Sequence, residues 1–225
     1  MFDPDASPVN ALPTVVLVLA ILIVVPELIF AAGSAGFGGP SAIAWRQDAI
    51  REFAFAGVIV DDMALRGNFD FDRLKRFLTY PFIHITFMQA LFSGVFVLAL
   101  GKFVGEYYRF VAMTVIFFGA SIFGAFLYGA LLNDPYPLTG AFAGAYGFIG
   151  AFTYILAGRI GAQGGNQFQA FQLIGLLMGV QLLFAFIGGD LTWVADLAGF
   201  VAGFFLASVL RPGGWAALLD RMRNR

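Results

Sequence analysis

Six apolar runs dominate this chain of 225 residues, and each is long enough to cross the roughly 30 Å hydrocarbon core of a bilayer as a helix. The runs lie at about 12 to 32, 82 to 100, 110 to 132, 140 to 157, 171 to 187 and 192 to 210. Charged residues make up only 12% of the chain, about half the share that is typical of a soluble domain. The sequence therefore predicts an all-α, polytopic membrane protein with six transmembrane helices, in contact with membrane lipids.

The spans divide the chain into a short N-terminal segment (1–11), a membrane domain (12–210) and a basic tail (211–225). The first run is interpreted as a mature helix, because no Lys or Arg precedes it and it is too long for a signal-peptide core. The connection from about 33 to 80 is the only long one. Since loops of that length without structure are uncommon, we expect it to contain helices of its own.

Three features of the composition limit the possible functions. The chain has no cysteine, so disulfides, thiolate metal sites and thiol nucleophiles are excluded. A formal net charge of -1 gives no indication of nucleic-acid binding. A single histidine, His84, is too little for a metal site or a haem, which need further ligands. We expect no cofactor and no metal.

The positions of the basic residues predict an orientation. Seven Lys and Arg residues in or beside the short connections fall on one side of a six-span topology: Lys102, Arg109, Arg159, Arg211, Arg221, Arg223 and Arg225. The short loops on the other side, 133–138 and 188–191, contain none. The positive-inside rule therefore places both termini in the cytoplasm, and we expect the membrane to be a bacterial inner membrane.

The fourth apolar run, GAFAGAYGFIGA, carries glycines on one helical stripe. Gly140, Gly144, Gly147 and Gly150 are three or four residues apart. Helices in a bilayer associate by close packing, and small residues at this spacing let two backbones approach. Similar pairs occur at 101 and 105, 175 and 179, and 199 and 203. The pattern predicts that the fourth and sixth helices cross closely, with the fourth at the centre.

The same stretch resembles the signature of the rhomboid intramembrane proteases, a Gly-Ala-Ser-Gly-Ala run followed by two residues, a glycine, two apolar residues and Gly-Ala. Four other stretches are similar to family elements in the family's order: LKRFLTYPFIH (74 to 84), HITFMQALFSGVFVLALG (84 to 101), VGEYYRF (104 to 110) and ADLAGFVAGF (195 to 204). The resemblance covers about residues 74 to 210. It implies a rhomboid-like bundle of six helices with a long, structured first loop.

The resemblance also implies where protease chemistry would lie. The family has a nucleophilic serine on the fourth helix, a histidine base on the sixth, and a histidine and an asparagine on the second that stabilise the oxyanion. The corresponding positions here are Phe142, Asp196, Gln89 and Ser93. All four are replaced, so the chain is expected not to be an enzyme, and the ring of Phe142 is expected to fill the former cavity.

Other positions carry expected supporting roles. The resemblance places Tyr146 where the family has an aromatic residue against the histidine. Of the family's Trp-Arg pair only Arg76 remains, and we expect Arg76 and His84 to anchor the first loop. The glycines expected to pack around the former site are Gly140, Gly144, Gly199 and Gly203.

Two acids within apolar runs need partners, because a charge inside the bilayer costs roughly 3 kcal/mol or more. Tyr146 and Gln89 are the donors expected for Asp196, which is interpreted as a structural hydrogen-bond node, with a proton-relay or ligand-binding role as the alternative. Glu27 is expected to reach water or to pair with a first-loop base such as Arg46.

The function implied by the resemblance is that of an inactive rhomboid relative, which binds other integral membrane proteins as clients or as partners in a larger complex. The identity of the partner and the oligomeric state stay open. The alternative is a protease with non-standard residues, in which Ser93 or Ser121 would be the nucleophile, although the sequence shows no base for either. A weaker alternative is a carrier of protons or small molecules that acts through Asp196.

Overall fold

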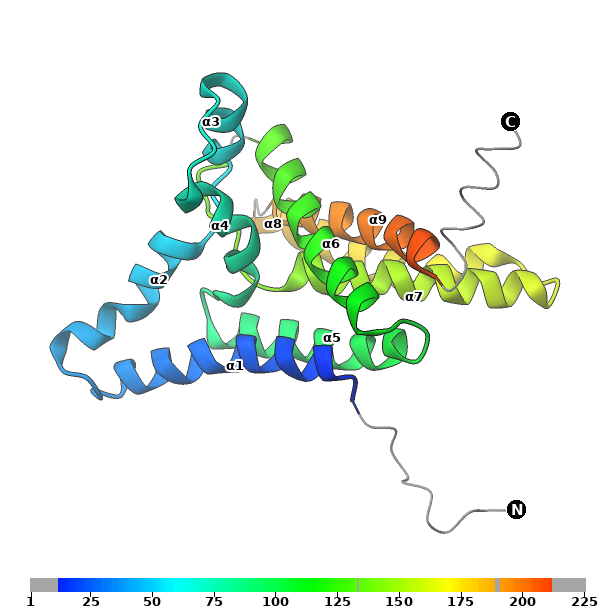
Figure 1. Ribbon diagram of the computed structural model, residues 1–225, viewed down its shortest axis with the longest axis horizontal. Coiled ribbons are helices and arrows are strands. Elements are labelled where there is room, and N and C mark those ends of the chain that lie inside the picture. The colour runs from blue at the N-terminus through cyan, green and yellow to red at the C-terminus, as the bar shows by residue number, and fades with distance from the viewer. Residues whose placement is uncertain (1–11, 133, 189–190, 212–225) are drawn as a thin grey trace, which may run out of the picture.

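The computed structural model describes residues 12–132, 134–188 and 191–211, and this part of the chain is helical without strands (Figure 1). The predicted N-terminal segment and nearly all of the predicted basic tail lie outside the described residues. The six long helices are α1 (Thr14–Ser34), α5 (Phe87–Gly105), α6 (Phe110–Leu131), α7 (Phe142–Ala162), α8 (Gln172–Gly188) and α9 (Trp193–Leu210). They correspond to the six predicted apolar runs, with ends that differ by up to five residues.

Within the described residues, five helical segments are long and apolar enough to cross a membrane. The exception is α7, which has 21 residues but carries glycines and tyrosines that lower its apolarity. Its neighbours explain this composition, because α7 packs against α5, α6 and α9, and almost every residue in its first half is buried. The central position predicted for this helix is confirmed.

The long first connection contains helices of its own, as predicted. They are α2 (Trp45–Phe53), α3 (Val58–Arg66) and α4 (Phe71–Thr79), flanked by the short 3₁₀ helices η1 (Pro40–Ala44) and η2 (Tyr80–Phe82). In Figure 1 these elements lie beside the bundle, at the end where α5 begins. Most of their bases face acids: Lys75 contacts Glu52 and Asp72, and Arg73 lies 2.9 Å from Asp62.

A buried ion pair ties α1 to this loop. Both carboxylate oxygens of Glu27, which is 4% exposed, accept hydrogen bonds of 2.9 Å from Arg46. Arg46 also donates to the carbonyl of His84 at 2.8 Å and lies over the ring of Phe30. The predicted pairing of Glu27 with a first-loop base is therefore confirmed, and one guanidinium joins α1, α2 and the start of α5.

The contact between α7 and α9 is a contact between backbones. A Cβ atom on Gly203 would collide with the backbone of Gly147, and one on Gly199 would collide with the carbonyl of Ala143. On the same face, a Cβ on Gly150 would meet the carbonyl of Phe200. The prediction that the fourth and sixth helices cross closely is confirmed, and any larger side chain at these positions would push them apart.

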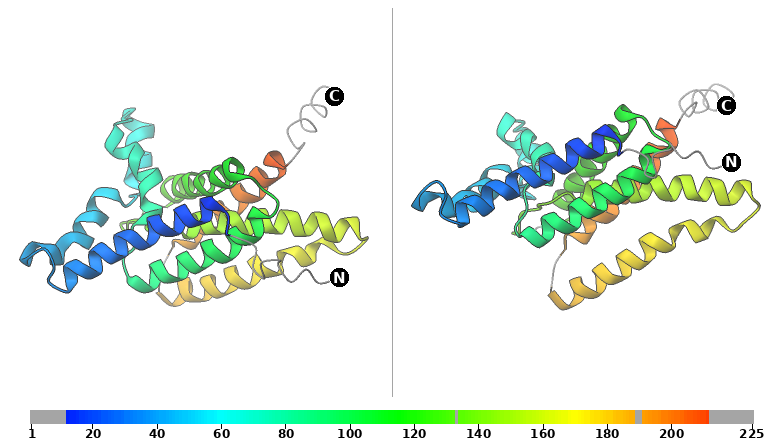
Figure 2. Two further views of the ribbon diagram at one scale, coloured as in Figure 1. Left: turned by 60° about the horizontal axis from the view of Figure 1, so that its bottom comes forward. Right: turned by 90° about the horizontal axis from the view of Figure 1, so that it is seen from below.

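Helix α8 differs from the rest of the bundle. It packs on α9 and η3 (Gln167–Phe171), and Figure 2 shows it standing apart from α5. Large apolar side chains such as Leu176 and Phe186 are exposed, the latter by 92%. Nothing lies within 4 Å of a Cβ atom built on Gly175 or Gly179, so this glycine pair does not lie at a close contact between helices of the described residues.

Candidate functional site

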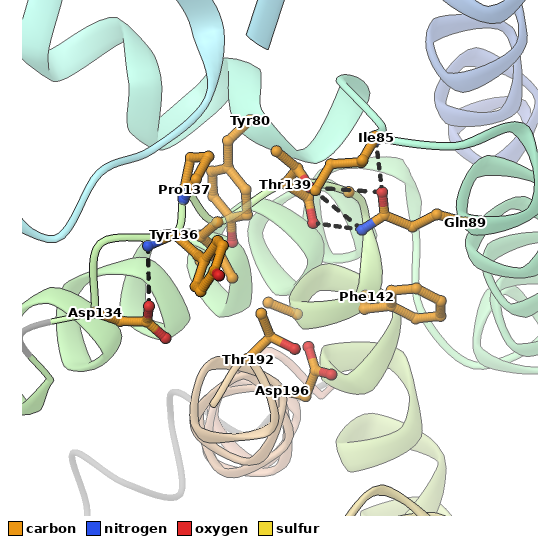
Figure 3. A pocket seen from close by; sticks show the side chains of 13 residues that line it. Tyr80, Ile85, Gln89, Asp134, Tyr136, Pro137, Thr139, Phe142, Thr192 and Asp196 are labelled. Carbon is orange, nitrogen blue, oxygen red and sulfur yellow. Dashed lines mark hydrogen bonds between the residues drawn. The ribbon is translucent and has the colours of Figure 1, made fainter. Parts of the chain in front are cut away.

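A cavity of about 300 Å³ opens at the end of the bundle where α5, α7 and α9 begin (Figure 3). Its walls come from the start of α5, the connection between α6 and α7, and the first turns of α7 and α9. The lining residues are Tyr80, Ile85, Gln89, Asp134, Tyr136, Pro137, Leu138, Thr139, Gly140, Phe142, Ala143, Thr192 and Asp196. Three of the four former protease positions line it, and Ser93 does not.

The chain enters α7 through a sharp turn at Gly140. The turn needs glycine, because φ is +87° and a Cβ atom would lie only 3.0 Å from Nε2 of Gln89. The amide of Gly140 donates to the carbonyl of Tyr80 at 3.0 Å, and the backbones of Phe55 and Leu138 exchange two hydrogen bonds. The connection is thus held against the first loop.

Phe142 is the first residue of α7, and its ring packs edge-on against Phe96 of α5, with 6.3 Å between the centroids. In Figure 3 the ring points away from Thr192 and Asp196. The expectation that this ring fills the cavity is wrong, since about 300 Å³ stays open beside it. The side chain packs toward α5 instead.

Gln89 closes the side of the cavity nearest α5. Its Nε2 donates to the carbonyl of Thr139 at 3.2 Å, and its Oε1 accepts from the amide of Ile85 at 2.8 Å. Thr86 caps the same helix by accepting from the amide of Gln89 at 3.1 Å. The side-chain amide of Gln89 therefore hydrogen-bonds to residues of the cavity wall, and it is not the donor that we expected for Asp196.

Asp196, in the first turn of α9, is 3% exposed. It accepts a hydrogen bond of 2.7 Å from Nε2 of Gln181 on α8. Sequence reasoning missed Gln181. The signal was present, because a glutamine in the middle of an apolar span tends to hydrogen-bond to a neighbouring helix.

His84 and Ser93 lie side by side behind the cavity wall, both fully buried. Nε2 of His84 is 2.9 Å from Oγ of Ser93, which donates to the carbonyl of Ala90 at 3.2 Å. The statement that no base accompanies Ser93 is therefore wrong. A corner between η2 and α5 brings together two residues that sequence spacing does not.

Burial also determines the protonation state of this pair. Burial and the nearby Arg46 guanidinium lower the pKa of His84 to about 4. The imidazole is thus neutral at physiological pH. The hydroxyl of Ser93 lies within hydrogen-bond distance of both Nε2 of His84 and the carbonyl of Ala90, and neither His84 nor Ser93 lines the cavity.

Other residues hold the elements around the cavity in place. Arg76 donates to the carbonyl of Ala54 at 2.8 Å, within the first loop. Tyr146 is buried one turn into α7, and Gly144 takes the ring of Phe117 from α6 against its backbone. The hydroxyl of Tyr80 donates to the carbonyl of Ser121 at 2.8 Å, and burial raises the pKa of this phenol.

The cavity has the chemistry of a binding site whose walls carry hydrogen-bond acceptors. Asp134 and Asp196 contribute carboxylates, and Tyr80, Tyr136 and Phe142 contribute aromatic surface. None of the described lining residues carries a positive charge. The arrangement suits hydrogen-bond donors or cations.

Comparison with known proteins agrees with this architecture. A family model described as the Rhomboid domain matches residues 72–213, more than half of the chain. The match begins in α4, at the end of the first loop, and runs through the last helix. A search of curated proteins gave no significant match.

Proposed function

Since the chain belongs to the rhomboid family, we propose that it is a non-catalytic member that binds other integral membrane proteins, as clients or as fixed partners. The observation that carries this proposal is the cavity at the former active site. It keeps an open volume of about 300 Å³, yet the residue at the nucleophile position is Phe142. An open space that is lined by carboxylates and aromatic rings, with a phenyl ring at the nucleophile position, is suited to recognition.

The loose packing of α8 supports the same function. A partner helix that approaches between α5 and α8 would meet exposed apolar side chains and could extend a polar group toward the cavity. The carboxylates of Asp134 and Asp196 favour a group that donates hydrogen bonds or carries positive charge, such as a lysine side chain of the partner. The first loop, held to α1 by Arg46, would give the partner a fixed surface.

Proteolysis by non-standard residues is the second candidate, and the buried pair of His84 and Ser93 is the observation that favours it. Two features weigh against it. Neither Ser93 nor His84 has exposed surface, and neither residue lines the cavity. We therefore propose that this pair fixes the corner between the first loop and α5.

We also propose that both termini are cytoplasmic, which would put the cavity at the outer face of a bacterial inner membrane. The distribution of Lys and Arg between the connections supports this orientation. A cysteine introduced at Tyr136, which is 73% exposed at the cavity, should react with a membrane-impermeant maleimide in intact cells. Labelling only after lysis would reverse the assignment.

Photocrosslinking in native membranes tests the binding function. A photoreactive phenylalanine at Tyr136 or Ile85, both on the cavity wall, should yield a discrete adduct with another membrane protein. The matched control is the same probe at Val111, which is 70% exposed near the opposite end of the bundle on α6 and should give no such adduct. Isolation of the protein alone from mild detergent, with no adduct at either cavity position, would contradict the proposal.

A further inference from the structure

A second hollow lies at the other end of the helices, where α7 and α9 end. It is a groove of about 600 Å³ between the connection from α5 to α6, the last two turns of α7, η3 and the end of α9. Figure 1 shows these ends together on the right of the molecule, away from the first loop. The groove shares no lining residue with the cavity described above.

Two guanidinium groups line this groove, those of Arg159 and Arg211. In the first loop, by contrast, most bases face carboxylates. Among the residues that the structure describes, no carboxylate lies within ion-pair distance of either arginine of the groove, and Arg159 lies over the ring of Tyr107 at 5.6 Å. Two like charges that line one hollow without acids make a site that attracts anions.

The remaining walls are part polar and part apolar. Tyr154 and Gln167 offer a hydroxyl and an amide, while Ile155, Ala157 and Phe204 give an apolar surface. Phe204 is held in place by an edge-on contact with Tyr154, with centroids 5.5 Å apart. Charged and apolar walls in one groove, at the ends of membrane-spanning helices, match a ligand with an anionic head and a hydrocarbon tail.

We propose that this groove binds an anionic phospholipid, with the phosphate between Arg159 and Arg211 and the start of an acyl chain along Ile155 and Phe204. Guanidinium groups recognise phosphate oxygens through paired N–H donors, and basic pockets between membrane helices hold lipid headgroups of this kind. A soluble phosphate could bind the two arginines, but it would make no contact with the apolar wall. A phospholipid would contact both the arginines and the apolar wall.

Native mass spectrometry of the full chain, released from mixed micelles, tests the proposal. The probes are phosphatidylglycerol and phosphatidylcholine at equal concentration, and the protein is expected to retain the anionic lipid preferentially. Replacement of both arginines, Arg159→Gln with Arg211→Gln, should lower that retention by roughly 30-fold, since each base contributes about a fivefold factor near a charged surface. Equal retention of both lipids by the unaltered protein would overturn the proposal.

The matched control is Arg109→Gln, which removes an exposed base at the same end of the bundle that does not line the groove. It should keep the preference for the anionic lipid. A loss as large as that of the double variant would show attraction by general surface charge and would contradict a specific site.

A third variant separates loss of binding from loss of folding. Gly158 lines the groove, and a Cβ atom there would meet nothing within 4 Å, so Gly158→Trp should fold while it occupies the apolar wall. We expect it to lower lipid retention although both arginines are present. Unchanged retention would contradict the acyl-chain contact. Displacement of the lipid by millimolar glycerol phosphate would assign the site to a soluble phosphate and overturn the lipid.

Discussion

Helices α9 and α8 each carry two glycines four residues apart, and the two pairs have opposite surroundings. Gly199 and Gly203 of α9 lie against the backbone of α7, whereas Gly175 and Gly179 of α8 face open space. The difference lies in the partner, because α7 presents its own small residue, Gly147, where Gly203 crosses it. The spacing allows close approach, but only a complementary face produces it.

The largest expected effect concerns the close contact between α7 and α9. Gly203→Val should remove most of the folded protein, a destabilisation of at least about 3 kcal/mol, because the added side chain would meet backbone that cannot rotate away. The measurement is the fraction that elutes as a monodisperse peak after heating in detergent. The control, Gly179→Val, has room for its side chain, and we expect little change in the temperature at which half of the protein is lost from the monodisperse peak. Similar losses in both variants would remove the distinction between the two helices.

A second prediction asks whether the first loop belongs to the rigid part of the molecule. Glu27→Gln leaves the guanidinium of Arg46 without its buried carboxylate, and we expect a loss of about 2 to 3 kcal/mol. The same heating experiment would report it as a lower midpoint. Limited proteolysis should then cut in α2 or α3 first. If the variant were as stable as the original, the loop would be held by other contacts.

A third prediction concerns the dependence of stability on pH, which we attribute to His84 at the corner between the first loop and α5. The pKa of His84 is about 4 in the fold and 6.5 in the unfolded chain, so between these values the unfolded state binds more protons and stability falls as the pH is lowered. A decrease from pH 7 to pH 5 should cost about 2 kcal/mol. In His84→Gln this part of the pH dependence should be absent, and an unchanged profile would mean that another group is responsible.

The smallest effect concerns α8 itself. Gln181→Leu removes the hydrogen bond that joins α8 to Asp196, and we expect a loss of about 1 kcal/mol, since such bonds between membrane helices are individually weak. Asp196→Asn combined with Gln181→Leu should cost little more than the single change. A loss as large as that of Gly203→Val would show that α8 is an integral part of the packed bundle.

Much of this architecture could be predicted from sequence, because it depends on features that are local along the chain. Length and apolarity gave the six helices, and the glycine stripe gave the crossing of α7 and α9. Three features depend on how separate segments meet, and the sequence did not show them: the pairing of His84 with Ser93, the bond from Gln181 to Asp196, and the direction of the Phe142 ring.

The same reasoning applies to restored chemistry. Phe142→Ser with Asp196→His would place a hydroxyl and an imidazole at the two former protease positions. We expect no proteolysis. The side chain of Gln89 is hydrogen-bonded to Thr139 and Ser93 is buried against His84, so neither residue is free to donate a hydrogen bond to an oxyanion. Efficient cleavage of a model transmembrane substrate by this double variant would show a scaffold much closer to a protease.

The most direct test of the central claim is a reaction of the unaltered protein in membranes with a fluorophosphonate probe, read out by peptide mapping. The account predicts no labelled serine, because Phe142 has no nucleophilic atom and the pair of Ser93 and His84 has no access to the cavity. Labelling of Ser93 that disappears in Ser93→Ala, together with cleavage of a transmembrane substrate, would contradict it.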